Sequence, residues 1–396
     1  MKKIELPFKT CTACGACASI CPKECINMEE GEYGFYYPSI NNDLCINCRL
    51  CEKVCHIITP EVSRRITDDN FYMFWLGDVS KRQSSTSGGA FTLFSKFILD
   101  QGGIVFGSYY NLTNERVEVG CTDNVDFEAF KKSKYVESYV GTSAKTIGRY
   151  LQDGRYVLYC GTPCQVAGIR KYLNTKKINQ ERLILIDFAC HGVPTSSALR
   201  LFKRTFETSN KKLSNIDFRY KDSKFPWHSQ TMKMYFTDGT SKIITRYSFY
   251  YYYFTKAFNL SINLRQSCYN CNQVGYSSAD ITIGDFWDII KYKPELDDNK
   301  GISFIKFHNS KWLSILNTTS DKNFVQHIPD GVVTDPYNKK SKASKLPERE
   351  KYLKLLFEKG CLYSSIKYFG FYRIIRDTYI SGLFSFIKNI IIKIKR

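Results

Sequence analysis

Two runs of cysteine constrain the fold of this chain more than any other feature of its sequence. The first run is Cys11-x2-Cys14-x2-Cys17-x3-Cys21-Pro22, and the second is Cys45-x2-Cys48-x2-Cys51-x3-Cys55. Three thiols spaced in this way can contact one side of a metal cluster, while the chain carries the fourth away to a second cluster. His56 stands where a proline usually follows the last cysteine. The two runs are therefore expected to exchange their fourth ligands.

The cysteine spacing is typical of the two-cluster bacterial ferredoxin domain and predicts two [4Fe-4S] clusters with crossed ligands. Two structural zinc sites, which also use C-x2-C pairs, are the alternative, but zinc sites rarely carry four cysteines at this spacing, let alone twice. Cys25 lies outside the pattern, and we interpret it as a small buried residue. The expected ligand sets are Cys11, Cys14, Cys17 and Cys55 for one cluster, and Cys45, Cys48, Cys51 and Cys21 for the other.

Length, cysteine usage and charge limit what else the chain can be. Its 396 residues predict two or three domains. Neither an apolar signal core nor a stretch of about 20 apolar residues occurs, so we expect a cytoplasmic protein whose 16 cysteines stay reduced. Residues 1–60 carry a net charge of −1 and residues 338–396 carry +11, from 15 basic and four acidic residues. That distribution argues against a nucleic-acid partner.

A glycine pair opens the first helix predicted in the body of the chain. Residues 71–77 read as a strand, and the apolar spacing that follows predicts a helix from about Gly89. Thr86 or Ser87 is a candidate cap. Gly88 and Gly89 let the backbone approach a ligand, and the N–H groups of a helix start attract anions such as a flavin pyrophosphate. An ordinary capped helix after a flexible turn is the alternative.

Two strand–loop–helix units follow and predict a parallel sheet. In the first, residues 156–159 form the strand, Thr162 caps the helix, Pro163 opens it, and Cys164 lies in its first turn, where the helix dipole is expected to lower the thiol pKa. In the second, Cys190 and His191 follow the apolar strand 183–188. Cys164 and Cys190 are therefore expected at the same sheet edge, where open α/β sheets bind ligands.

A third cysteine pair, Cys268-x2-Cys271, cannot complete a tetrahedral site alone. Together with Cys164 and Cys190 it makes four thiols, which suggests a third cluster. A zinc site or thiols without a metal remain the alternatives at this point.

Several blocks, in order, resemble the coenzyme F420 hydrogenase/dehydrogenase beta-subunit family. They are SSTSGGAFT, SKYVESYVG, YCGTPCQVAGIR, DFACHGVP, DFRYKDSKFPW, RQSCYNC and ADITIGDFW. With the N-terminal cysteine domain, the resemblance covers about residues 8–310. Chlorophyll-pathway reductases, which act on other substrates, are similar to this family too.

The resemblance implies a flavoprotein that holds FAD and a third [4Fe-4S] cluster in its body. The third cluster would be held by Cys164, Cys190, Cys268 and Cys271, with Cys160 the nearest substitute. His191 is a candidate proton donor or a hydrogen-bond partner of the cluster. Lys221 and Trp227 are weaker pocket candidates, because a solvated lysine and a packed tryptophan are the simpler interpretation. The implied flavin-binding residues are Ser87, Gly88, Gly89, Lys134, Tyr135 and Ser138.

We therefore expect an α+β ferredoxin-like dicluster domain (1–62), an α/β domain with a mixed sheet that binds flavin and a cluster (70–310), and a basic helical C-terminal extension (311–396). From Ile380 onward, apolar residues fall on one helical face and Lys388, Lys393, Lys395 and Arg396 lie off it. That extension is either a helix packed on the body or an amphipathic anchor for peripheral contact with the inner face of the membrane.

The expected function is an FAD- and iron–sulfur-dependent oxidoreductase that reduces a small organic substrate, with surface polysaccharide biosynthesis as one setting. The alternative is a coenzyme F420 dehydrogenase, a ferredoxin reductase or an electron-transfer subunit for a partner enzyme. The redox partner would be a ferredoxin-like donor or reduced deazaflavin. No G-x-G-x-x-G fingerprint follows a strand, so direct nicotinamide binding has little support.

Overall fold

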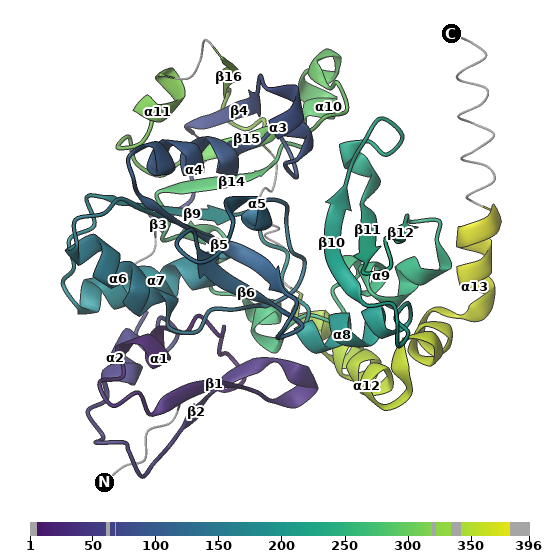
Figure 1. The fold of residues 1–396 in the computed structure, drawn as a ribbon, viewed down its shortest axis with the longest axis horizontal. Coiled ribbons are helices and arrows are strands. Elements are labelled where there is room, and N and C mark those ends of the chain that lie inside the picture. Colours follow the sequence, from purple (N-terminus) through teal and green to yellow (C-terminus); the bar gives the residue numbers. More distant parts are fainter. Residues whose placement is uncertain (1–5, 61–63, 68, 319–321, 334–341, 381–396) are drawn as a thin grey trace.

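The computed structural model describes residues 6–60, 64–67, 69–318, 322–333 and 342–380. The N-terminal domain consists of two short helices and a hairpin (Figure 1). Helices α1 (Ala16–Ile20) and α2 (Leu50–Val54) each start inside a cysteine run, and strands β1 (Ile26–Glu30) and β2 (Tyr36–Ile40) pair antiparallel with Ile26 opposite Ile40. Each cysteine run is therefore a loop that turns into a helix.

A nine-stranded mixed sheet forms the body of the protein, in the order β16-β4-β15-β14-β9-β8-β5-β6-β7. Its centre is parallel, because β5 pairs with β8, β8 with β9, and β9 with β14 in parallel. The flanking pairs of β14 with β15, β15 with β4, β4 with β16, and β5 with β6 are antiparallel. The strands are β4 (Phe71–Leu76), β5 (Ile104–Asn111), β6 (Arg116–Cys121), β7 (Ser138–Tyr139), β8 (Val157–Gly161), β9 (Leu183–Phe188), β14 (Ile281–Asp285), β15 (Ser303–Phe307) and β16 (Asn323–Ile328).

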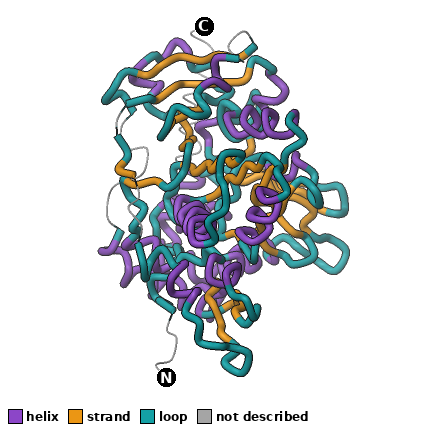
Figure 2. The backbone as a smooth tube through the Cα atoms, turned by 90° about the vertical axis from the view of Figure 1, so that its left-hand side faces the viewer, coloured by secondary structure: helices purple, strands orange, loops and turns teal. Residues whose placement is uncertain are grey.

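Helices cover both faces of this sheet. Helix α4 (Ala90–Asp100) packs on one face, in a core that it shares with Phe74, Ile186 and Ile305. Helices α6 (Ser143–Gln152) and α7 (Pro163–Thr175) cover the other face and contact α1 and α2, so the N-terminal domain shares one apolar core with the body. Figure 2, turned by 90°, shows the β1–β2 hairpin at the end of the molecule that carries the N-terminus.

A second sheet of three antiparallel strands lies beside the body: β10 (Leu213–Tyr220), β11 (Thr231–Phe236) and β12 (Ser241–Ile244) (Figure 1). Helices α8 (Ser196–Arg204), α9 (Thr255–Asn259), α12 (Leu346–Phe369) and α13 (Phe371–Ile375) adjoin it, and α12 breaks at Gly360, whose φ is 78°. Shorter elements complete the chain: α3 (Val79–Gln83), α5 (Phe127–Phe130), α10 (Ile289–Tyr292), α11 (Ser314–Asn317), and the two-stranded pair β3 (Arg64–Arg65) with β13 (Tyr276–Ser277).

The expected fold class is confirmed in its main parts: a dicluster-type N-terminal region, a mixed-sheet α/β body and a long C-terminal helix. The large sheet takes its edge strand β16 from residues beyond position 310. The amphipathic pattern predicted from Ile380 onward lies, apart from Ile380 itself, outside the described residues. Within the residues that the structure describes, no helix combines the length and apolar character that a membrane span requires.

Candidate functional site

The first cysteine set gathers where α1 and the end of α2 meet. Cys11, Cys14, Cys17 and Cys55 line one small cavity together with His56. Burial raises the pKa of the Cys17 thiol, and the neighbouring Cys14, Cys11 and Cys55 thiolates raise it further. The His56 ring is also buried, which lowers its pKa to about 4, and its Nε2 lies 2.9 Å from the Thr12 hydroxyl. These cysteines combine three thiols of the first run with one of the second.

The second cysteine set mirrors the first. Cys21, Cys45, Cys48 and Cys51 line another small cavity, and Cys25 joins them. Cys25 is buried, and its Sγ lies 3.3 Å from the Cys21 Sγ. Cys48 is exposed, so this set lies nearer the protein surface than the first. Both groupings are those expected from the spacing, and the ligand roles themselves remain predictions.

The third set comes from three distant parts of the chain. Cys164 lies in the first turn of α7, Cys190 follows β9, and Cys268 and Cys271 come from the single turn at Gln266–Asn270 and its end. Burial raises the pKa of Cys164 well above its usual range, and the thiolates of Cys271, Cys190 and Cys268 raise it further. The helix dipole was expected to lower this pKa. That expectation is wrong, because burial and three neighbouring thiolates outweigh the dipole.

Cysteine groups of this kind fit a cluster better than a single ion. A zinc ion holds each thiolate about 2.3 Å from one metal centre, whereas a [4Fe-4S] cluster offers a separate iron to each thiolate. In the described part of the chain, no group of three or more His, Cys, Asp or Glu side chains closes on a single ion position. The cysteines of the first two sets instead surround cavities.

A cavity of about 740 Å³ lies between the carboxyl ends of the central strands and the three-stranded sheet. Cys190, His191 and Gly192 form part of its wall, and Phe218, Arg219 and Met232 contribute from the second sheet. Cys160 also lines it. Of the expected flavin-binding residues, the structure brings to this cavity Ser87, Gly89, Lys134, Tyr135 and Ser138.

Gly88 is not among the cavity-lining residues. Its N–H donates to the Ser303 Oγ at 2.9 Å, so this group is already hydrogen-bonded. A Cβ at Gly88 would lie 2.2 Å from the Phe74 carbonyl oxygen, which explains the glycine by close packing against β4. Gly88 therefore shapes the loop, while Gly89, whose φ is 96°, directly precedes α4 and faces the cavity.

The expectation that Thr86 or Ser87 caps α4 is wrong. The Thr86 Oγ1 accepts a hydrogen bond from the Ser133 N–H at 2.8 Å, and the Ser87 Oγ donates to the Ile302 carbonyl at 2.7 Å. Both side chains fix the loop to distant segments instead of capping α4. Gly89, Ala90 and Phe91, at the start of α4, line the cavity, and the N–H groups of a helix's first turn have no intrahelical partner.

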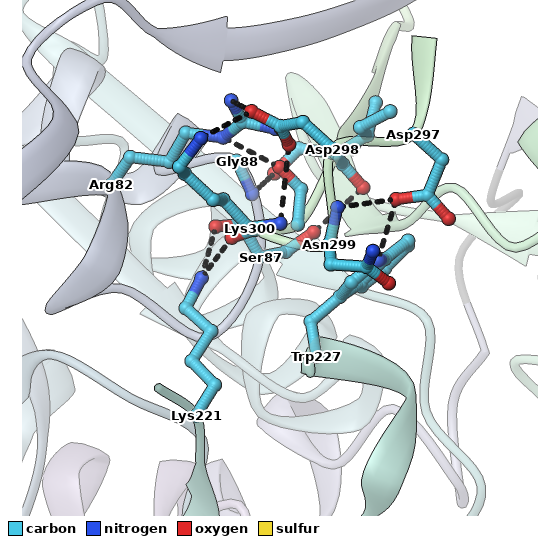
Figure 3. Close-up of polar contacts among 12 residues, drawn as sticks. Arg82, Ser87, Gly88, Lys221, Trp227, Asp297, Asp298, Asn299 and Lys300 are labelled. Atoms are coloured by element: carbon cyan, nitrogen blue, oxygen red, sulfur yellow. Dashed lines mark hydrogen bonds and ion pairs between the residues drawn. The ribbon is translucent and has the colours of Figure 1, made fainter. Parts of the chain in front are cut away.

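A polar network anchors the loop that contains Ser87 and Gly88 (Figure 3). Lys221 extends from the end of β10 and donates to the Ser87 carbonyl at 3.0 Å and to the Lys300 carbonyl at 2.5 Å. Arg82 donates to the Gly301 carbonyl at 2.8 Å and pairs with Asp298. Lys221 is buried, which lowers its pKa to about 7, so the interpretation of a solvated lysine is wrong.

Trp227 is packed rather than exposed to the cavity, as its simpler interpretation predicts. Its side chain is 1% exposed and stacks on Trp287, and its indole N–H donates to Asp297 at 3.0 Å. The tryptophan that lines the cavity is Trp287, which ends the block ADITIGDFW but was not singled out there as a pocket residue.

Basic side chains face the cavity from the segment 131–135 and from β10. Burial lowers the pKa of Lys134 to about 7, and its Nζ donates to the Ala129 and Lys131 carbonyls. The Tyr135 hydroxyl accepts from Arg219 at 3.0 Å, and Arg219 pairs with Asp285 at 3.0 Å. Arg219 lies in the block DFRYKDSKFPW, but sequence reasoning did not single it out, because an arginine in a strand does not by itself indicate a role.

One β8 residue, Tyr159, lies close to both the first and the third cysteine set. Burial raises the pKa of Tyr159, a fully buried β8 residue, and thiolates from both sets, Cys164 and Cys14, add to the rise. Cys14 of the first set adjoins Gly168 in α7, whose first turn carries Cys164 of the third set. The third set reaches the cavity through Cys190.

Two family models match segments of the chain. Residues 10–57 match the 4Fe-4S dicluster domain, and residues 154–329 match the family described as coenzyme F420 hydrogenase/dehydrogenase, C terminus of the beta subunit. A solved structure described as a xenon derivatization of the F420-reducing [NiFe] hydrogenase complex from Methanosarcina barkeri is similar to this chain. The two share 14% sequence identity, with a TM-score of 0.45, over 74% of this chain and 92% of that one. Among curated proteins, none matches.

Proposed function

We propose that this chain, which joins a 4Fe-4S dicluster domain to a domain of the coenzyme F420 hydrogenase/dehydrogenase beta-subunit family, is an electron-transfer flavoprotein subunit. It passes electrons between a redox partner and FAD in the 740 Å³ cavity by way of three [4Fe-4S] clusters. The observation that carries the proposal is the position of Cys190, which belongs to the third cysteine set and also lines the cavity.

The cysteine sets suggest the order of clusters along the electron path through the protein. Cys48 of the second set is exposed, whereas the first set is covered by α6 and α7 in a shared core. Tyr159 lies beside both the first and the third set. We infer that electrons move from the surface through the second, first and third clusters to the cavity, or in reverse.

The residues around the cavity fit a bound FAD. The start of α4 offers backbone N–H groups beside Gly89, and Lys134 supplies a buried amine whose charged form an anion would stabilise. A flavin supplies the coupling between single-electron steps and a two-electron step. The chain's own contribution is to bind the pyrophosphate at α4, to place Tyr135 and Arg219 beside the cavity, and to exclude water through the apolar wall at Phe218 and Met232.

The comparisons favour the electron-transfer and F420-type alternative over a reductase of surface polysaccharide biosynthesis. On this proposal the small-molecule partner is a deazaflavin or another planar organic acceptor. Aromatic and cationic residues on the second-sheet side of the cavity, including Phe218, Arg219 and Phe258, suit a planar anionic molecule. His191, which is exposed and lines the cavity beside Cys190, remains a candidate proton donor.

The test is anaerobic purification of the full chain followed by three separate additions. Iron and sulfide should each reach about 12 per chain if three clusters are present. The purified protein is then mixed with reduced deazaflavin, with NADH, and with reduced ferredoxin, while flavin absorbance is followed. Bleaching by deazaflavin or ferredoxin, but not by NADH, is the expected result. If no flavin co-purifies or binds on reconstitution, the flavoprotein claim fails and a pure electron-transfer subunit remains.

A further inference from the structure

We propose that Arg265 is a positioning residue that fixes the first cysteine set against the third and stabilises the reduced form of the clusters these sets would hold. The inference rests on the proposed function and deepens it, since it concerns the step by which electrons cross from the dicluster domain into the body.

The Arg265 side chain joins the N-terminal domain to the body. It is 1% exposed, and its three nitrogens have three partners. Nε donates to the Cys11 carbonyl at 2.7 Å, and Nη2 donates to the Tyr36 carbonyl at 2.7 Å. Nη1 forms an ion pair with Glu137, which lies just before the cavity residue Ser138. One guanidinium therefore holds a ligand loop of the first set, a strand of the dicluster domain, and a segment of the cavity wall.

The Arg265 backbone is tied to two of the three segments that carry the third set. Its N–H donates to the Val193 carbonyl at 2.8 Å, three residues after Cys190. Its carbonyl accepts from the Cys268 N–H at 3.0 Å. Since the side chain contacts Cys11 and the backbone contacts Cys268, a shift of Arg265 changes the separation of the two sets. Electron transfer by tunnelling falls steeply with that separation.

The charge of Arg265 acts on both sets as well. Its Nε lies 2.7 Å from the Cys11 carbonyl oxygen and its own carbonyl accepts from the Cys268 N–H, so the buried guanidinium belongs to a residue that contacts a ligand of each set. The ion pair with Glu137 and the high basicity of arginine keep the guanidinium charged. A buried cation beside a cluster favours its more negative, reduced state, so its removal should lower the cluster midpoint potentials.

Two substitutions separate the position of the side chain from its charge. Arg265→Lys keeps the charge but cannot reach Cys11, Tyr36 and Glu137 in one planar fork. Arg265→Gln removes the charge. Arg349→Gln is the matched control, because Arg349 is also 1% exposed and donates from Nε to the adjacent Leu264 carbonyl at 2.7 Å, while its ion-pair partner is Glu350.

The readouts are iron content, redox titration of each cluster, and magnetic coupling between the reduced clusters by electron paramagnetic resonance. We expect both Arg265 variants to weaken the coupling between the first and third clusters, and Arg265→Gln alone to lower their midpoint potentials. Arg349→Gln should retain wild-type coupling and potentials.

The inference is overturned if Arg265→Lys, with full iron, keeps wild-type coupling, or if Arg349→Gln shifts the potentials as much as Arg265→Gln. If Arg265→Gln loses iron, the magnetic coupling between the first and third clusters in Arg265→Lys alone decides whether the inference holds. A wild-type protein that lacks the third cluster would instead contradict the proposed function, so the two failures are distinguishable.

Discussion

Gly168 lies so close to Cys14 that a Cβ built on the glycine would come within 2.6 Å of the Cys14 sulfur. Gly168 belongs to α7, whose first turn carries Cys164. The middle of one helix therefore contacts the first cysteine set, and its N-terminus supplies the third. This packing makes α7 a rigid connection between two proposed clusters.

A side chain at position 168 should therefore disturb the first cluster. We expect Gly168→Ala to lower iron content by up to about four per chain, because the added methyl group displaces Cys14 from its cavity. Gly148→Ala in α6 is the control, since its Cβ would meet the flexible Ile178 Cδ1 at 2.8 Å. Equal iron content in the two variants would show that Cys14 can move aside without losing the cluster.

The third set should be separable from the other two. Replacing Cys268 and Cys271 together with Ala should remove about four iron while the dicluster signals persist. Cys160→Ala should remove none, because Cys160 lies near Asp187 and Lys134 rather than within the third set. Iron analysis with visible spectroscopy measures both. A loss of iron in Cys160→Ala, without a loss in Cys164→Ala, would reverse the ligand assignment.

Flavin affinity should depend on pH through Lys134. Burial lowers the pKa of this lysine to about 7, so without ligand it is charged below pH 7 and neutral above. An anionic pyrophosphate binds the charged form better, and affinity should therefore fall as pH rises from 6 to 8.5. We expect a decrease of about tenfold, equivalent to about 1.4 kcal/mol.

Equilibrium titration with FAD checks this dependence. Lys134→Met should bind more weakly at pH 6 and lose the pH dependence, whereas Lys131→Met, whose lysine pairs with Glu128, should retain it. An unchanged pH profile in Lys134→Met would place the pyrophosphate elsewhere in the cavity.

The elements that sequence reasoning located correctly are those fixed by local signals. The strand Leu183–Phe188 is apolar at every position except Asp187, and the start of α7 follows from Thr162 and Pro163, to which the structure adds a capping box with Gln165. Both signals lie within a few residues, so tertiary contacts did not need to be known.

What the sequence could not predict depends on contacts between distant residues. Thr86 and Ser87 have the right chemistry for helix caps, but their side chains hydrogen-bond to Ser133 and Ile302 instead. The Cys164 pKa is raised because the fold buries it beside three other thiolates. The pair of Arg265 with Glu137 joins residues 128 positions apart, and neither belongs to a motif that points to the other.

The basic C-terminal segment should be dispensable for the cofactors. Deleting residues 381–396 should leave iron content unchanged, because Asp377 and Thr378 retain their contacts with Tyr252 and Ile374. If the segment is a membrane anchor, the full chain should sediment with anionic vesicles, less so at high salt, and the deletion should abolish this binding. Insolubility of the shortened chain would instead indicate that the segment packs on the body.

The exposed aromatic residues just before that segment support the membrane interpretation. Tyr372 is 76% exposed and Tyr379 is 68% exposed, and aromatic rings beside basic residues favour the interface of a bilayer. Tyr372→Ser should weaken vesicle binding in the full chain, whereas Tyr276→Ser, at a position 45% exposed and distant in sequence, should not. Equal vesicle binding by the wild type, Tyr372→Ser and Tyr276→Ser would show that Tyr372 is not part of the anchor.

A protein electron donor should reach the chain at the second cysteine set. Leu44 and Ile46, which flank Cys45, are 55% and 57% exposed, and Cys48 is exposed beside them. Apolar side chains around an exposed cluster suit a transient protein contact. Replacing Leu44 and Ile46 together with Asp should slow reduction by reduced ferredoxin about tenfold, within the range over which interface substitutions change association. Reduction by dithionite, which needs no docking surface, should be unaffected.

Leu112→Asp, at a position 52% exposed between β5 and β6, is the matched control and should leave both rates unchanged. Stopped-flow absorbance measures both rates. Slower reduction by dithionite as well would show damage to the cluster, and an unchanged ferredoxin rate would mean that electrons enter elsewhere.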